Sequence, residues 1–217
     1  MTDTATLRAR NADFWAQTSP GWVHQADRHD EIGRPLGAVA LDQLQPQPGE
    51  RVLDVGCGCG GTTAEIARAV GPSGNAVGLD LAEAMVATAR SRFSVPGAAG
   101  PQFVTGDIET LGAVPGAPFD AVYARMTLML LADPVAGLTT IRRSMRSGGR
   151  MAATVFRDGG ANPGCRARCS VRRHICDRCR RCRSATTPAP SHSPTRPAQP
   201  GFSPPPASPA STSTRTT

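Results

Sequence analysis

Three features are missing from these 217 residues: lysine, a long apolar run and an apolar N-terminal segment. The sequence contains no stretch of about 18 apolar residues, the length that a membrane-spanning helix needs. Residues 1–17 lack the apolar centre of a secretory signal, so we expect a cytoplasmic, reducing location in which the seven cysteines are free thiols. All 24 basic residues are arginine, which is typical of a GC-rich gene.

Large apolar side chains are scarce in residues 157–217, where only Val171, Ile175 and Phe202 occur. That segment also holds ten of the 20 prolines and fifteen serines or threonines. Its apolar surface is too small to offset the entropy lost on ordering, so we expect residues 161–217 to form a disordered tail.

The net positive charge of the chain comes from the same segment. Residues 1–156 carry 13 arginines and 15 acidic side chains, a net charge of −2, whereas residues 157–217 have a net charge of +9. Nucleic acid is therefore an unfavourable partner for the first 156 residues, and the tail could hold it only non-specifically through phosphates.

The N-terminal part predicts two short helices. Apolar residues favour helices over residues 5–17 and 35–44, with a loop at Pro20 and Gly21 between them and Pro35 in the first turn of the second helix. We expect residues 1–46 to form a helical lid.

Strands and helices then alternate, which predicts a core domain over residues 47–160. Strands are expected at 51–55, 75–80, 101–107, 119–125 and 149–156, and helices at 61–71, 81–93 and 133–145. This order is typical of βαβ units with right-handed crossovers. The predicted fold is α/β, a Rossmann-like, doubly wound, mainly parallel sheet.

The turn after the first strand, with the sequence LDVGCGCGG, is rich in glycine. Gly56, Gly58 and Gly61 fit G-x-G-x-x-G, a weak signal that several nucleotide-binding folds share. Asp54 precedes the first glycine and would repel a pyrophosphate, so it favours a positively charged ligand without phosphate. S-adenosyl-L-methionine (SAM) has those properties, and an NAD-dependent dehydrogenase is disfavoured.

Two further acids end the following strands. Asp80 comes 24 residues after Gly56, where a doubly wound fold places an acid that binds ribose hydroxyls. Asp107 ends the third strand and could accept a hydrogen bond from an adenine amino group, with Ile108 against the ring. Either acid alone could also be a solvated carboxylate or a helix cap.

Several segments, taken in order, resemble the motifs of class I SAM-dependent methyltransferases. They are VLDVGCGCGGTTAEIA, GLDLAEAMVATAR, VTGD, FDAVYAR and DPVAGLTTIRRSMRSGGRMAATVF. The resemblance covers residues 10–156 and is strongest to the small-molecule, quinone-biosynthesis-type branch. It implies that Asp54, Gly56 and Gly58 line the methionine end of SAM, Asp80 binds the ribose, Leu81 flanks the adenine, and Asp107 with Ile108 contacts the adenine edge. Cys59 is interpreted as a packing residue.

No catalytic signature identifies the methyl acceptor. Arg125 and Met126, at the end of the fourth strand, could contact SAM or substrate, and His24 and His29 are candidate bases that could equally be structural. Trp15 and Trp22 are better candidates for an apolar lid, which favours a small apolar or aromatic acceptor.

The resemblance ends between Pro163 and Cys165. A reading-frame change there would turn codons for Ala, Leu, Val and Asp into runs of Arg, Pro, Cys, Ser and Thr, as the tail contains. Loss of the last strands of the fold would leave a sheet edge unpaired, so impaired SAM binding is expected. The alternative is a non-catalytic remnant of the fold with a basic tail that binds nucleic acid.

The run GCRARCSVRRHICDRCRRCR, residues 164–183, contains five cysteines and eight arginines. Its two C-x2-C steps share Cys179, and no separate second pair follows that could close a zinc site. The arginines would repel a cation. We therefore expect no metal site in this chain.

Overall fold

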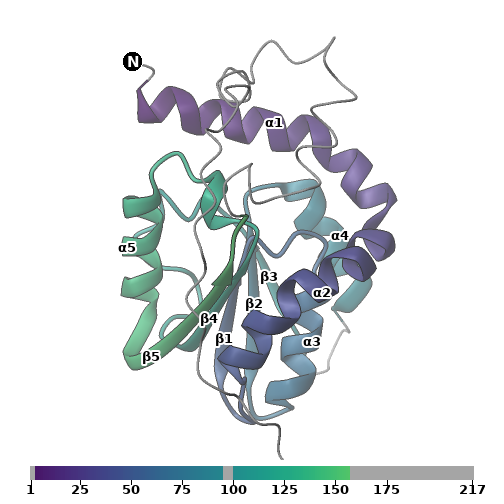
Figure 1. The fold of residues 1–217 in the computed structure, drawn as a ribbon, viewed down its shortest axis with the longest axis vertical. Coiled ribbons are helices and arrows are strands. Elements are labelled where there is room, and N and C mark those ends of the chain that lie inside the picture. The colour runs from purple at the N-terminus through teal and green to yellow at the C-terminus, as the bar shows by residue number, and fades with distance from the viewer. Residues whose placement is uncertain (1–2, 95–99, 157–217) are drawn as a thin grey trace, which may run out of the picture. The chain divides into compact units, whose positions relative to one another are not determined.

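A five-stranded parallel sheet forms the centre of the structure, a computed structural model that describes residues 3–94 and 100–156. Its strand order is β3-β2-β1-β4-β5, and all four pairings are parallel (Figure 1). The strands are β1 (Arg51–Val55), β2 (Asn75–Asp80), β3 (Gln102–Thr105), β4 (Phe119–Arg125) and β5 (Met145–Thr154). For these residues the predicted Rossmann-like fold is confirmed.

Helices cover both faces of this sheet and its carboxyl edge. They are α1 (Thr4–His24), α2 (Ala26–Leu44), α3 (Gly61–Val70), α4 (Glu83–Phe93), the 3₁₀ turn η1 (Leu128–Leu130) and α5 (Pro134–Ser144). Figure 1 shows α2, α3 and α4 on one side of the sheet, α5 on the other, and α1 across the end of the sheet to which the strands point.

Two apolar clusters attach these layers. On the α5 face, Ile141 packs with Leu53 and Val122; on the other face, Ile66 and Leu44 pack against alternate strand residues. Side chains of a strand alternate between faces, and a parallel sheet is buried on both, which explains why β1, β2 and β4 read as nearly continuous apolar runs.

The N-terminal helices differ from their predicted bounds. The expected loop at Pro20 and Gly21 was wrong, because α1 continues through both residues to His24. Pro20 cannot donate a backbone hydrogen bond to the Ala16 carbonyl, and the Ser19 hydroxyl donates to that carbonyl instead at 3.2 Å. The side chain of Ser19 thus replaces the bond that the proline removes.

Pro35 does not occupy a first turn either. It lies inside α2, which begins nine residues earlier, at Ala26. Packing explains the longer helix: Gly37 faces the phenol of Tyr123, whose hydroxyl donates to the Gly37 carbonyl at 3.1 Å. Contact with β4 therefore outweighs the local effect of the proline.

The last described strand begins earlier than predicted. The connection between the helix predicted at 133–145 and the strand predicted at 149–156 is instead a bulge within β5, because Met145 pairs with Phe119 while Arg150 pairs with Ala121. Gly148, with φ of +73°, has the left-handed backbone that the bulge requires.

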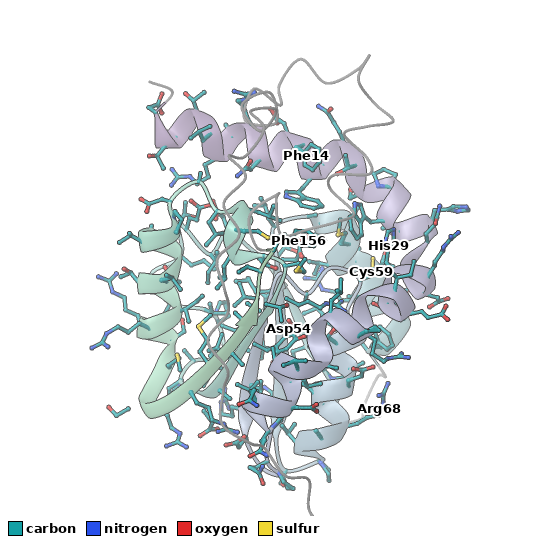
Figure 2. All side chains as sticks on the ribbon, viewed as in Figure 1. Phe14, His29, Asp54, Cys59, Arg68 and Phe156 are labelled. Atoms are coloured by element: carbon teal, nitrogen blue, oxygen red, sulfur yellow. The ribbon has the colours of Figure 1, made fainter. Side chains whose placement is uncertain are left out.

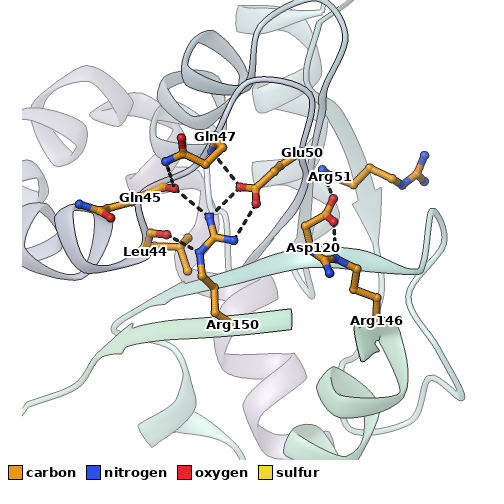
Figure 3. Close-up of polar contacts among 8 residues, drawn as sticks. All are labelled: Leu44, Gln45, Gln47, Glu50, Arg51, Asp120, Arg146 and Arg150. Atoms are coloured by element: carbon orange, nitrogen blue, oxygen red, sulfur yellow. Dashed lines mark hydrogen bonds and ion pairs between the residues drawn. The ribbon is translucent and has the colours of Figure 1, made fainter. Parts of the chain in front are cut away.

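A charged network fastens β5 to the start of the sheet (Figure 3). The Arg150 guanidinium donates to both carboxylate oxygens of Glu50 at 2.7 Å, and to the carbonyls of Leu44 and Gln45 at 2.7 and 2.8 Å. Those carbonyls end α2, so one side chain caps the helix and joins two parts of the chain 100 residues apart.

Several predictions concern residues 157–217, which lie outside the described residues. They are the disordered tail, the frame change after Pro163, the missing last strands and the cysteine–arginine run. In the described ranges, no helix combines the length and apolarity needed to cross a membrane.

Candidate active site

A cavity of about 310 Å³ opens at the carboxyl ends of the strands, beneath α1. Its lining comes from α1, α2, the glycine turn after β1 and the segments that follow β2, β3 and β4. Doubly wound sheets bind ligands at this edge, where neighbouring strands connect to helices on opposite faces. Of the eight residues predicted to contact cofactor, all except Asp54 line this cavity.

The glycine turn brings bare backbone to the cavity. Gly56 and Gly58 have φ of +74° and +54°, values that side chains disfavour. A methyl group at Gly56 would overlap the side chain of Thr127, whereas one at Gly58 would meet nothing nearer than the Met85 sulfur at 3.9 Å. Gly58 therefore leaves room at the cavity wall that a ligand can fill.

Asp80 holds the end of β2 against this turn. Its carboxylate accepts hydrogen bonds from the backbone N–H of Gly58 at 2.8 Å and of Ala82 at 2.9 Å. Burial raises the pKa of Asp80, and the two backbone hydrogen bonds oppose that rise. Leu81 follows directly and also lines the cavity.

Asp107 and Ile108 line the cavity where the chain leaves β3. One oxygen of Asp107 accepts the N–H of Glu109 at 2.8 Å, and the other lies 3.8 Å from the Arg8 guanidinium of α1. Ile108 is buried in the apolar cluster on the α5 face. This corner therefore combines a carboxylate with a fixed apolar side chain.

Asp54 is placed differently from the other predicted residues. Its side chain is buried, does not line the cavity and accepts a hydrogen bond from the Thr63 hydroxyl of α3 at 2.7 Å. Burial raises its pKa to about 6, although the hydrogen bond from Thr63 and the charge of Arg125 lower it. Figure 2 labels Asp54 among the strands.

Arg125, the last residue of β4, reaches into the cavity along α2. Its side-chain stem packs at Gly37, and its guanidinium lies at Gly33, where an added methyl group would come within 2.6 Å of a guanidinium nitrogen. The two glycines are four residues apart, so they lie on one face of the helix and form a groove for this side chain.

Flat side chains of α1 and α2 form the roof. Trp15 and Trp22 lie at 5.9 Å between ring centroids, and Trp22 stacks on His29 at 4.0 Å with an interplanar angle of 26°. All three line the cavity, whereas His24 is exposed and does not. The sequence made His24 and His29 equal candidates for a base, and the structure places only His29 at the cavity.

Asp30 and Arg92 belong to this region but were not predicted. Arg92 of α4 donates to the Asp30 carboxylate at 2.7 Å and to the Cys59 carbonyl at 2.6 Å. Asp30 also lies against Gly61, the first residue of α3. These contacts join residues 62 positions apart, and no local sequence pattern reports such a pairing.

The two cysteines of the glycine turn are buried thiols. Burial raises the pKa of Cys59 to about 11 and that of Cys57 well above its usual value, so both stay protonated at neutral pH. Cys59 packs with Ala26, Ala82 and Met85, as expected for a packing residue. Within residues 3–94 and 100–156, no group of three or more His, Cys, Asp or Glu side chains could hold a metal ion.

The charge of the lining tests whether SAM fits. Four acidic side chains and two arginines line the cavity: Asp30, Asp80, Asp107, Glu109, Arg8 and Arg125. An excess of negative charge repels a pyrophosphate and favours a ligand that carries a sulfonium and an ammonium. The residues present therefore fit SAM better than a dinucleotide.

Comparison with known proteins agrees with this geometry. The family described as "Methyltransferase domain" matches residues 46–196. The match continues past Pro163, where the motif resemblance was expected to end.

Two curated relatives are methyltransferases by name. Aklanonic acid methyltransferase DauC of Streptomyces sp. (strain C5) is 31% identical over 156 residues, 69% of this chain and 70% of DauC. The ubiquinone/menaquinone biosynthesis C-methyltransferase UbiE of Ectopseudomonas mendocina is 36% identical over 54% of this chain and 45% of UbiE. The chain thus spans less than half of the second relative.

A solved structure shows the same fold. It is a chain of the Haloferax volcanii complex between the Trm112 methyltransferase activator and a methyltransferase, with a TM-score of 0.56, 23% identity and coverage of 64% of this chain and 59% of that one. From the family match, the relatives and the fold together, the chain belongs to the class I SAM-dependent methyltransferases, whose cofactor is S-adenosyl-L-methionine.

Proposed function

We propose that this chain transfers a methyl group from SAM to a small, apolar or aromatic molecule. The observation that carries the proposal is one cavity lined by two unlike sets of residues. The strand ends contribute acids and bare glycine backbone, at Gly58, Asp80 and Asp107, which we call the polar half; α1 and α2 contribute aromatic and aliphatic side chains, which we call the apolar half. When bound, SAM supplies a methyl group activated by its sulfonium.

The polar half suits the cofactor. Asp80 would accept hydrogen bonds from ribose hydroxyls, and Asp107 with Ile108 and Leu81 would hold the adenine. Arg125 is the cavity's second arginine, and unlike Arg8 it is not paired with Asp107. Its guanidinium would bind the carboxylate at the methionine end, beside Gly56.

In this proposal Asp54 supports the glycine turn and α3 without lining the cavity. Its carboxylate supports the start of α3 through Thr63 and adds negative charge beneath the sulfonium and ammonium. This replaces the direct contact with methionine that the sequence predicted, because the side chain does not reach the cavity.

The apolar half suits an uncharged, flat acceptor. Trp22, Ile32 and Leu36 line it from α1 and α2. The names of the relatives, with aklanonic acid and ubiquinone or menaquinone biosynthesis, support a small-molecule acceptor. The protein's part in such a reaction is to align the acceptor and exclude water.

Calorimetry of the full chain with SAM, S-adenosylhomocysteine and NAD tests the proposal. We expect SAM and S-adenosylhomocysteine to bind and NAD to give no heat. Binding of NAD alone would refute it. The same titration tests whether SAM binding is impaired, as the sequence predicts. All residues that line the cavity lie between Arg8 and Leu131, ahead of the tail, and this favours ordinary SAM affinity. An impaired site would bind SAM weakly.

The alternative of a nucleic-acid-binding remnant depends on the basic tail, which lies outside the described residues. It predicts retention of RNA or DNA that falls steeply with salt, together with no methyl transfer. A gel-shift titration against salt measures the first, and formation of S-adenosylhomocysteine with a panel of acceptors measures the second.

A further inference from the structure

His29 is a partly buried histidine of α2 that stacks on Trp22. It lies one helical turn before Gly33, against which the Arg125 guanidinium rests. Arg125 in turn ends β4, whose neighbour β1 leads into Gly56. His29 is therefore on the part of α2 that faces the strand ends of the proposed methyl-transfer site.

Other groups of the cavity that could take a proton already have partners. The Asp30 carboxylate pairs with Arg92 at 2.7 Å. Both oxygens of Glu109 accept backbone N–H groups, those of Ala132 and Asp133, at 3.1 and 2.5 Å. Raised pKa values keep the thiols of Cys57 and Cys59 protonated, so they cannot act as bases.

Two acids remain, and both belong to the polar half. Asp80 accepts two backbone hydrogen bonds, and Asp107 accepts one and lies near Arg8. His29 differs from them, because it forms a ring stack and, within the described ranges, no ion pair. An imidazole is also the side chain best suited to exchange a proton near neutral pH.

We propose that Trp22 and His29 form the acceptor subsite, in which a planar aromatic hydroxyl compound packs beside Trp22 and gives its proton to His29. The proposal rests on the proposed function and narrows its acceptor to phenol-like molecules. The aromatic row from Trp15 to His29 supplies flat surface for such a ring, and Ile32 and Leu36 extend it.

Methyl transfer and proton transfer are coupled in the proposed step. The bond between sulfur and the methyl carbon breaks and its electron pair stays on sulfur, while the acceptor oxygen forms the new bond to that carbon. The hydroxyl proton passes to the unprotonated ring nitrogen of His29. The ring becomes an imidazolium and later releases the proton to water. Charged side chains that share the cavity with His29 are Arg8, Asp30, Asp80, Asp107, Glu109 and Arg125.

A chromogenic phenol tests the subsite without turnover. p-Nitrophenol is added to the full chain in the absence of SAM, at a pH one unit below its own pKa in water, and its absorbance reports the phenolate fraction. We expect the protein to shift the bound probe toward phenolate. His29→Phe, which keeps a flat ring against Trp22, should abolish the shift, and His29→Gln should do the same.

Matched controls separate proton transfer from folding. His24→Phe alters the exposed histidine at the end of α1 and should leave the shift unchanged. p-Nitroanisole has no proton to give, so it should bind wild type and His29→Phe equally. Trp22→Ala should raise the dissociation constants of both probes by about tenfold. With a phenol acceptor and SAM, His29→Phe should lower the rate by about 100-fold.

Two outcomes would overturn the inference. An equal phenolate shift in wild type and His29→Phe would show that another group takes the proton, and failure of p-nitrophenol to bind wild type would exclude a phenol subsite. Calorimetry with SAM alone distinguishes the two proposals. If the wild-type chain does not bind SAM, the proposed function is refuted. If it binds SAM normally but gives no phenolate shift, only the role of His29 is refuted.

Discussion

The carboxylate of Asp80 accepts a hydrogen bond from the backbone N–H of Gly58 at 2.8 Å, across 22 positions of sequence. The contact joins the end of β2 to the glycine turn after β1, and Asp80 also accepts the N–H of Ala82. One side chain thus fixes the turn and presents its remaining acceptor sites to the cavity. Removing its charge should affect ligand binding more than folding.

Asp80→Asn should raise the dissociation constant for SAM by about 10- to 100-fold, because hydrogen bonds to a charged carboxylate contribute about 1.5–3 kcal/mol. Calorimetry measures the change. Asp42→Asn, at an exposed position of α2, is the matched control and should bind SAM as wild type does. Equal affinity in both variants would remove Asp80 from the cofactor site.

Arg150→Met should destabilise the fold by about 2 kcal/mol, since it leaves Glu50 and two carbonyls at the end of α2 without their shared donor. The Glu50 pairing holds the pKa of that carboxyl below its usual value. Arg150→Lys should recover only part of the loss, because an ammonium cannot bind a carboxylate through two parallel hydrogen bonds.

Urea unfolding measures this change. Arg68→Met is the control, since Arg68 is an exposed arginine of α3 that Figure 2 shows at the outside of the helix. Its replacement should stay within about 0.5 kcal/mol of wild type. A similar loss in both variants would mean that the network around Arg150 adds little to stability.

The sheet could be predicted from sequence because its central strands are short apolar runs between turn residues. The bounds of β1, β2 and β4 agree with the prediction. The N-terminal helices could not be bounded in this way. Pro20 and Pro35 indicate helix ends locally, but the Ser19 hydroxyl and the packing of Gly37 on Tyr123 keep both helices continuous.

The site was predicted from a geometric rule that parallel strands end at one edge, and the structure brings Gly58, Asp80 and Asp107 to one cavity. Their contacts with SAM stay predictions. The position of Asp54 follows from a second geometric rule. Side chains alternate along a strand, so Asp54 shares a face with Val52 and points to α3, away from the cavity.

Gly56→Ala should disturb the glycine turn in two ways. A side chain at φ of +74° costs about 1–2 kcal/mol, and the new methyl group would overlap Thr127. We expect a lower melting temperature and at least tenfold weaker SAM binding. Thr127→Ala in the same chain should relieve the overlap but not the strain, so recovery should be partial.

The control for that change is Gly112→Ala, because a methyl group at Gly112 would meet nothing within 4 Å and its φ is not in the left-handed range. Its melting temperature and SAM affinity should equal those of wild type. If Gly56→Ala has the same melting temperature and SAM affinity as Gly112→Ala, neither stability nor SAM binding requires the close approach of this turn to Thr127 and to the ligand.

Asp54→Asn should change how stability depends on pH. Burial raises the pKa of Asp54 to about 6 from an ordinary value of 3.8, so the folded chain binds a proton between about pH 4 and pH 6 that the unfolded chain has released. The contribution of this group to stability therefore falls as pH rises through that range, by about 3 kcal/mol in all.

Asparagine has no such titration and can still accept the Thr63 hydroxyl hydrogen bond. Relative to wild type, the variant should therefore become more stable from pH 4 to pH 7, by an amount of about 3 kcal/mol. Urea unfolding of both proteins at several pH values gives the difference directly, and comparing the two chains cancels the titration of the other carboxyls. A difference that stays constant with pH would mean that Asp54 is ionised in the fold across the whole range, and that Arg125 and Thr63 offset its burial completely.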